Sequence, residues 1–413
     1  MSATTRVDRR PTARDVLHDI AAGGITRTLG AIVLSLAIAS VFIIFSNERV
    51  SETLGYLFTR PADFFSAAGR ALGDAFAAMF RGSIYNSRAA TFEAGIKPLT
   101  ESLRFAGPLI AAGLGIALTF RTGLFNIGGQ GQILVGAGWA AFVATQIQLP
   151  GVLHLIVAAA FGILGAAFWA SIVGFLKART GAHEVIVTIM LNYIALGLLT
   201  FAMKTPILNG TGSSNAATTM PPDPDAVFPR LLGPAYEIRV SFVLCILAVV
   251  VYWWIVERST IGFRLRMVGL NPDAARAAGI DVARTTILAM ALSGAFVGIA
   301  AVNQSLGRSG NFAPNIDVGI GFDAITVALL GGSRAVGVLF AGLLFGALKA
   351  AGPQMQIADV PPEILGVIQG LIVLFIAAPP LVRAVFRFLP APRLATDIAT
   401  GAIAQPEQKG GQG

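Results

Sequence analysis

Ten apolar runs, most of them close to 20 residues long, constrain the fold of this 413-residue chain more than any other feature. An α-helix of about 20 residues rises roughly 30 Å, which is the thickness of the hydrocarbon core of a bilayer. Strands of a membrane barrel would alternate apolar and polar residues, and the runs do not alternate. The sequence therefore predicts an all-α fold, a polytopic membrane helical bundle with about ten transmembrane helices. The runs cover residues 29–46, 103–120, 124–148, 151–176, 184–203, 239–256, 286–304, 322–333, 335–352 and 362–381.

The composition excludes a water-soluble domain. Charged residues make up 13% of the chain and hydrophobic residues 55%, whereas a soluble domain has about 25% charged residues. The net charge of +8 could indicate a nucleic-acid partner, but Lys and Arg of a membrane protein gather in its cytoplasmic loops. We therefore expect membrane lipid, and no nucleic acid, around the chain.

The basic residues set the expected orientation. Residues 1–28 form a basic N-terminal segment, which is placed in the cytoplasm. The first six of the ten crossings then bring the basic loop 257–285 to the cytoplasmic side as well. Two short crossings that meet at residues 331–334 place the tail 391–413, expected to be flexible, on the same side. The transmembrane domain is expected over residues 29–390, with both termini in the cytoplasm.

Residues 62–81 have the pattern of an amphipathic helix. They belong to the segment 47–97, which is assigned to the outside although it has six basic residues. Arg70 and Asp74 would lie on one side of the helix, opposite an apolar side. This pattern predicts a helix lying in the membrane interface, and a further entry into the membrane is the alternative. The apolar side consists of Phe64, Phe65, Ala68, Leu72, Phe76 and Met79.

Small residues recur every four positions in two of the runs. Such stripes let helix backbones approach closely, which matters because lipid provides no hydrophobic force between helices. Packing within the chain is the first interpretation, and a subunit interface is the second. The stripes are Gly162, Ala166, Ala170 and Gly174 in one run and Gly342, Gly346 and Ala350 in the other.

Polar side chains within the apolar runs are the candidate contacts for a solute. Unpaired polar groups are costly in hydrocarbon, so they either bond to neighbouring helices or line a path for a polar solute. Both interpretations remain open. The candidates are Asn126, Gln130, Gln132, Asn192, Tyr193, Asn303 and Gln304. The sequence has no phosphate-binding loop and no cluster of metal ligands, so we expect no catalytic residue, no metal and no cofactor.

The segment "GLNPDAARAAGI", residues 269–280, has the signals of a short, well-capped helix outside the bilayer. Asn271 is a favourable N-cap, Pro272 suits the first helical position, and Gly279 suits the residue that ends a helix. A rigid element of this kind could dock into a partner and transmit movement.

Four separated motifs carry a resemblance to a known family. The chain resembles the permease subunits of bacterial ABC importers for simple sugars and branched-chain amino acids, and within that family the nucleoside branch. The resemblance covers about residues 100–380. Gln130 is a departure, because relatives commonly have Glu there. The motifs are "GLFNIGGQGQ", "GAHEVIVTIMLNYIA", "GLNPDAARAAGI" and "FDAITVALLGGSRAVG".

The resemblance implies a non-enzymatic permease subunit in a bacterial inner membrane, forming the pathway for a nucleoside or a related simple sugar. It implies separate ATPase subunits, a second and usually non-identical permease chain, and an extracytoplasmic solute-binding lipoprotein. It also makes the short helix the ATPase-coupling helix. The coupling residues are Gly269, Asn271, Pro272, Ala274, Ala275, Arg276 and Gly279.

Three alternatives remain open at this stage. The first is an ABC permease for simple sugars or branched-chain amino acids. The second is an ion-coupled secondary transporter of a small polar solute, which generally needs an acid or a histidine within the membrane. The third is a membrane scaffold or receptor subunit that transports nothing.

Overall fold

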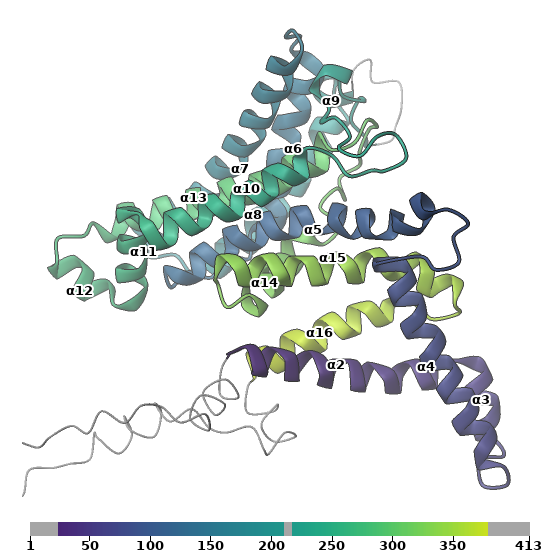
Figure 1. Ribbon diagram of the computed structural model, residues 1–413. Coiled ribbons are helices and arrows are strands. Elements are labelled where there is room, and N and C mark those ends of the chain that lie inside the picture. The colour runs from purple at the N-terminus through teal and green to yellow at the C-terminus, as the bar shows by residue number, and fades with distance from the viewer. Residues whose placement is uncertain (1–23, 210–216, 379–413) are drawn as a thin grey trace, which may run out of the picture. The chain divides into compact units, whose positions relative to one another are not determined.

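The computed structural model describes residues 24–209 and 217–378 of the chain (Figure 1). The described residues form helices joined by turns, with one isolated bridge between Arg230 and Arg239 and no strand. The predicted all-α class is therefore confirmed. The predictions for residues 1–23 and for the tail 391–413 lie outside the described residues.

The chain divides into two units. The smaller unit takes in residues 1–42 and 367–413, and its described part consists of most of α2 (Gly24–Ser46) and α16 (Glu363–Ala377). Ala31 of α2 and Phe375 of α16 are buried against each other in a small apolar cluster.

The larger unit, residues 43–366, contains the remaining helices. They are α3 (Glu48–Leu54), α4 (Pro61–Ser83), α5 (Phe92–Arg121), α6 (Gly129–Gln146), α7 (Val152–Thr180), α8 (Glu184–Met203), α9 (Pro206–Asn209), α10 (Ser241–Trp253), α11 (Thr260–Leu270), α12 (Pro272–Ala277), α13 (Val282–Ser305), α14 (Ile320–Leu330) and α15 (Ala335–Ile357). A 3-10 turn at Pro224–Ala226 and a π-helical turn at Trp254–Arg258 complete it.

Seven helices of the described residues are long and apolar enough to cross a membrane. They are α2, α5, α7, α8, α10 with its π-helical extension, α13 and α15. The other three predicted runs coincide with α6, α14 and α16, which do not meet the same length and hydropathy. The chain is thus a multi-pass membrane protein, and the count of ten transmembrane helices stays a prediction.

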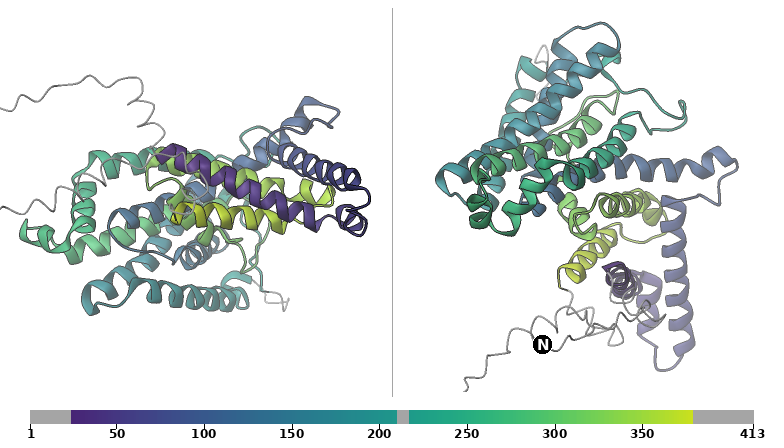
Figure 2. Two further views of the ribbon diagram at one scale, coloured as in Figure 1. Left: turned by 90° about the horizontal axis from the view of Figure 1, so that it is seen from below. Right: turned by 60° about the vertical axis from the view of Figure 1, so that its left-hand side comes forward.

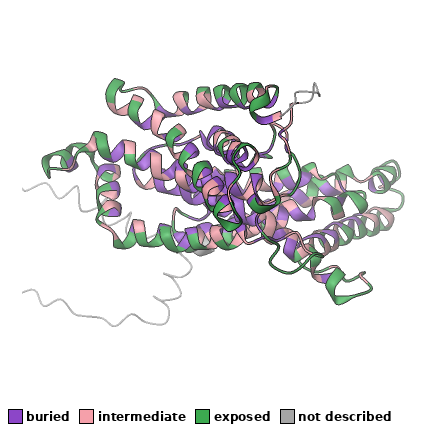
Figure 3. Cartoon of the chain, turned by 90° about the horizontal axis from the view of Figure 1, so that it is seen from above, coloured by how far each residue is buried: buried purple, intermediate pink, exposed green. Residues whose placement is uncertain are grey.

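Helix α5 forms the centre of the larger unit. In its most apolar stretch 78% of the residues are buried, against 22% for α8. It packs against α10, α13, α14 and α15 (Figure 1). The large apolar side chains on the outer faces of α7 and α8, including Phe168, Met190 and Phe201, are exposed, and Figure 3 shows such exposed outer faces in green. Exposed apolar faces of this kind suit contact with lipid.

The small-residue stripes pack within the chain, as the first interpretation predicted. A side chain added at Gly174 would lie 2.8 Å from the Ile287 backbone of α13. A side chain added at Gly346 of α15 would lie 2.6 Å from Ala106 of α5. Both glycines are therefore needed for close approach of two helix backbones.

The amphipathic segment 62–81 lies within α4, which is beside α3 (Figures 1 and 2). The buried face of α4 is a row of small residues packed against α15, whereas Phe65, Phe76 and Phe80 are exposed. The position of α4 in the membrane interface stays a prediction. The buried row is Ala68, Ala71, Ala75, Ala78 and Gly82.

Two connections lie at the helix ends predicted to be cytoplasmic. Residues 331–334 form the predicted break between α14 and α15, with positive φ angles of 59° at Gly332 and 54° at Ser333. Residues 257–285, predicted as a loop with one short helix, also contain the eleven-residue helix α11. Its mixture of arginines and apolar residues gave no clear periodicity in the sequence.

Candidate functional site

The stretch between α5 and α6 is not helical, although it lies inside the bundle. Residues 123–128 leave the end of α5, and Leu124 and Asn126 are buried. The Asn126 side chain donates a 3.0 Å hydrogen bond to Ser293, which is half-way along α13. Irregular backbone at such depth requires partners within the protein for its N–H and C=O groups.

Asn126 and Gln132 provide some of these partners. The Asn126 carbonyl oxygen accepts the Gly128 N–H at 2.8 Å and the Gln132 side-chain amide at 3.1 Å. Both side chains are almost wholly buried. Their polar atoms are therefore used to fold the interruption and to begin α6.

Asn192 of α8 holds the same stretch from the other side. Its carbonyl oxygen accepts the Gly131 N–H at 2.8 Å, and its amide donates to the Ile127 carbonyl at 3.1 Å. One side chain thus satisfies a donor and an acceptor of the interrupted backbone. Tyr193, next in sequence, is 69% exposed on the opposite side of α8 and lies apart from this group.

Glu184 anchors the start of α8 to the same region. Its carboxylate pairs with Lys177 of α7 and accepts a 3.4 Å hydrogen bond from the Phe125 N–H. The interruption is consequently held by side chains from α8 and α13, with Lys177 of α7 supporting Glu184, and its contacts are distant in sequence.

Gln130 belongs to a second polar group, at the point where the first turns of α6 and α14 meet. Its side chain hydrogen-bonds to Asp317, which is 5% exposed in the loop before α14. Burial raises the pKa of the Asp317 carboxyl, while the Gly319 N–H and Gln130 oppose that rise. Backbone contact between Gly129 and Gly321 leaves no room for a side chain at either glycine.

Lys349 of α15 completes this second group. Its ammonium pairs with Asp323 at 2.7 Å and donates to the Val318 carbonyl at 3.2 Å. Val318 has a φ of 45°, an unusual value for a β-branched residue that is sustained only by strong surrounding contacts. The charged side chains of α14 and α15 thus fix the turn that faces Gln130.

Replacing Lys349 with methionine is expected to lower the free energy of unfolding by about 1–3 kcal/mol, between the values for exposed and buried ion pairs. The loss arises because the half-buried Asp323 carboxylate would lose its ion-pair partner. Adding Asp323→Asn is expected to recover part of the loss, as thermal unfolding of the four members of a double-mutant cycle would reveal. Strictly additive effects would contradict this role of the pair.

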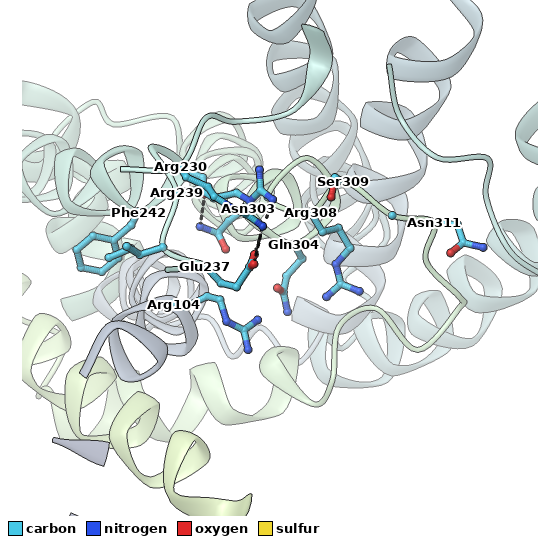
Figure 4. A pocket seen from close by; sticks show the side chains of 14 residues that line it. Arg104, Arg230, Glu237, Arg239, Phe242, Asn303, Gln304, Arg308, Ser309 and Asn311 are labelled. Atoms are coloured by element: carbon cyan, nitrogen blue, oxygen red, sulfur yellow. Dashed lines mark hydrogen bonds and ion pairs between the residues drawn. The ribbon is translucent and has the colours of Figure 1, made fainter. Parts of the chain in front are cut away.

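A pocket of about 330 Å³ opens at the outer end of α13, on the side predicted to be extracytoplasmic (Figure 4). Asn303 and Gln304, two of the predicted solute contacts, line it. Phe242 and Ser241 at the start of α10 form part of its wall. The structure therefore separates the predicted residues: Asn126, Gln132 and Asn192 lie together deep in the bundle, Gln130 lies beside Asp317, and only the α13 pair reaches this pocket.

Four arginines also line the pocket, and sequence reasoning did not identify them. Arg104 pairs with Glu101 at 2.8 Å, and Arg230 pairs with Glu237 at 2.7 Å. The others are Arg239, whose guanidinium donates to the Phe228 carbonyl at 2.7 Å, and Arg308. Arginines gathered on the side predicted to be extracytoplasmic run against the usual bias of basic residues toward the cytoplasm, and this departure was the signal in the sequence that could have identified them.

The short helix at residues 272–277 is present as α12 and is capped as predicted. The Asn271 side chain accepts the N–H groups of Asp273 and Ala274, both at 3.0 Å. Gly279 ends the helix with a φ of 80°. Ala275 is fully buried, so α12 rests on the rest of the protein through this residue.

Gly269 connects α12 to the interruption. A side chain at this position would collide with the backbone of Arg121 and Thr122, where α5 ends and the non-helical stretch begins. Arg121 in turn donates a 3.1 Å hydrogen bond to the Ser333 carbonyl, in the turn between α14 and α15. Tyr252 donates to the same carbonyl at 2.9 Å. A displacement of α12 would therefore be passed on through Gly269 of α11 and through Arg121 to residues 123–128 and 331–334.

These features define a multi-pass helical membrane protein with interrupted helices in its interior and a capped helix at one end. Residues 99–377 match the family described as branched-chain amino acid transport system / permease component. The match covers more than half of the chain, and the chain belongs to this family. The family consists of transport subunits and not of enzymes. Helices α2 to α4 lie outside the matched residues.

Several ABC transporter permeases are similar to the chain. The guanosine ABC transporter permease protein of Bacillus subtilis is 38% identical over 288 residues, which are 68% of this chain and 82% of the relative. The nucleoside ABC transporter permease protein of Lactococcus lactis subsp. cremoris is 36% identical, over 68% of this chain and 79% of the length of that relative. The glucose ABC transporter permease protein of Haloferax volcanii is 34% identical over 67% and 75%, respectively. No solved structure matches the chain.

Proposed function

We propose that this chain is the membrane permease subunit of an ATP-binding cassette importer and that it forms the pathway for a nucleoside. The observation that carries the proposal is the contact of Gly269, at the entrance to α12, with the backbone of Arg121 and Thr122. Two nucleoside permeases among the similar proteins support the solute class.

In this proposal α12 docks onto a separate ATPase subunit in the cytoplasm. Its caps make it rigid, and its outer face is exposed, so it suits insertion into a partner. The residues Gly269, Asn271, Pro272, Ala274, Ala275, Arg276 and Gly279 would form or support the docking element.

The interrupted segments are the parts that move in this proposal. ATP binding would shift α12, and the shift would pass through Arg121 to residues 123–128 and through Ser333 to α14. Asn126, Gln132 and Asn192 would keep the first interruption intact during the movement. Gln130 would respond to movement of α14, because its partner Asp317 lies shortly before the first residue of that helix.

The outer pocket would receive the solute from an extracytoplasmic binding lipoprotein. Asn303 and Gln304 are the proposed solute contacts there, and their amides suit ribose hydroxyls and base edges. A second permease chain, proposed to be a non-identical paralogue, would complete the pathway. Ten crossings with both termini in the cytoplasm, and α4 in the outer interface, complete the proposed topology.

Uptake by the complete complex in vesicles tests the solute class. The binding protein, both permeases and the ATPase would be reconstituted into vesicles. The cytoplasmic face of the complex would point into the vesicle, which contains the ATP. We expect ATP-dependent accumulation of labelled nucleosides and no accumulation of labelled glucose or leucine above the level without ATP. Accumulation of glucose or leucine in place of nucleosides would assign the chain to another branch of its family.

A further inference from the structure

Arg308 is the guanidinium in the outer pocket that has no partner. It follows α13 in the loop leading to α14, is half-buried, and makes no hydrogen bond or ion pair with any described residue. Burial, and then the nearby charge of Arg104, lowers the pKa of Arg308. An arginine nevertheless stays protonated in proteins and presents its N–H donors in a fixed fork. The fork is therefore available to a ligand.

The amide side chains around Arg308 use their nitrogens in hydrogen bonds and leave their carbonyl oxygens free. The Asn303 amide nitrogen donates to Ser241 at 2.9 Å, and the Gln304 amide nitrogen donates to the Ile316 carbonyl at 3.4 Å. Both carbonyl oxygens remain able to accept. The buried Nε of Arg239 has no hydrogen-bond partner among the described residues. Figure 4 shows Arg308 and Gln304 extending side by side from neighbouring parts of the chain.

This set of free atoms distinguishes purine bases. A guanidinium fork donates to two adjacent acceptors, and the O6 and N7 atoms of a 6-oxopurine are such a pair. Adenine has a donor, its N6 amino group, in place of O6. The Asn303 amide nitrogen donates to Ser241 and to the Cys245 sulfur, whereas the Gln304 amide nitrogen has only one of its two N–H groups in a hydrogen bond, so the discrimination against adenine rests on the Arg308 fork. The carbonyl oxygens of Asn303 and Gln304 suit the N1–H of a 6-oxopurine.

We propose that Arg308, with the carbonyl oxygens of Asn303 and Gln304, makes the outer pocket selective for 6-oxopurine nucleosides such as inosine and guanosine. The inference rests on the proposed function, since it assumes that a nucleoside passes this pocket. The pocket volume of about 330 Å³ is at the small end of the range for ligand sites, consistent with one nucleoside.

Competition between inosine and adenosine in the reconstituted complex tests the selectivity. Wild-type vesicles are expected to take up inosine faster than adenosine by on the order of tenfold, the discrimination typical of one bidentate base contact. Arg308→Gln is expected to bring the two rates within a factor of about two to three, because the fork is lost. Arg308→Lys should lose the preference as well, since it keeps the charge without the fork. Arg60→Gln, an exposed position before α4, serves as the matched control and should keep the preference.

The possible outcomes separate the two proposals. Equal uptake of both nucleosides by the wild type, or an unchanged preference in Arg308→Gln, would overturn the base selectivity while ATP-driven nucleoside uptake still stands. A preference retained in Arg308→Lys would show that charge and not the fork decides. Faster uptake of guanosine monophosphate than of guanosine would assign the pocket to a phosphate. Absence of uptake of every nucleoside would end the proposed function and this inference together.

Discussion

Replacing Ala277 with proline is expected to lower ATP-driven uptake at least tenfold, while the chain still inserts and the complex still hydrolyses ATP. A proline inside a helix removes one backbone hydrogen bond and clashes with the preceding turn, which costs about 3 kcal/mol. Helix α12 has six residues and cannot absorb that cost. Ala277 is exposed, so the substitution disturbs the docking element more than the bundle.

Two further variants make this prediction specific. Ala277→Ser retains the backbone N–H and is expected to transport at close to the wild-type rate. Ala275→Pro removes the 3.0 Å hydrogen bond from the Ala275 N–H to the Asn271 carbonyl and should uncouple the complex as strongly. Uptake and ATP hydrolysis would be measured in the same vesicles. Wild-type uptake in either proline variant would argue against a coupling role for α12.

Replacing Asn192 with leucine is expected to destabilise the folded protein strongly. Leucine has a similar size but leaves the Gly131 N–H and the Ile127 carbonyl without the partners that they have now. An orphaned buried group costs about 1–3 kcal/mol, so the thermal midpoint of the purified protein should fall by roughly 5 °C or more. The effect should appear without any solute, because it concerns the backbone of the interruption.

Tyr193→Phe is the control for this variant, because Tyr193 is adjacent in sequence but exposed on the other side of α8. Its thermal midpoint should match that of the wild type. If Asn192→Leu were equally stable and changed only the solute affinity, Asn192 would be a pathway residue and not a support for the interruption.

Local signals were the part of the structure that the sequence predicted well. The caps of α12 depend on Asn271 and Gly279, which lie within eight residues of each other, and the caps formed as expected. The break at residues 331–334 was likewise predicted from its two glycines and from the charge balance of the tail. Helix periodicity and turn chemistry act over a few residues, so a single sequence contains enough information for them.

Contacts between residues that are distant in the sequence could not be predicted from it. Asn126 meets Ser293, which is 167 residues away, and Gln130 at the start of α6 meets Asp317 in the loop before α14. The amides were therefore recognised as unusual, but their partners could not be chosen. The pocket arginines come from α5, from the segment before α10 and from the loop after α13, and no single stretch contains enough of them to reveal a site.

The face of α4 was also decided by a distant partner. Its phenylalanines form the more apolar side, yet a row of alanines is buried, because α15 approaches closely and presents Ala351 and Gln354 there. Large side chains would keep the two helices apart. Hydrophobicity alone therefore identified the helix but not its packing side.

The source of energy for uptake tests the central claim most directly. The purified chain, with its second permease and binding protein, would be placed in vesicles with and without the ATPase, under either a proton or a sodium gradient. Our account predicts nucleoside accumulation only when the ATPase and ATP are both present, with no effect of collapsing the gradients. Accumulation that is driven by an ion gradient in vesicles lacking the ATPase would contradict it.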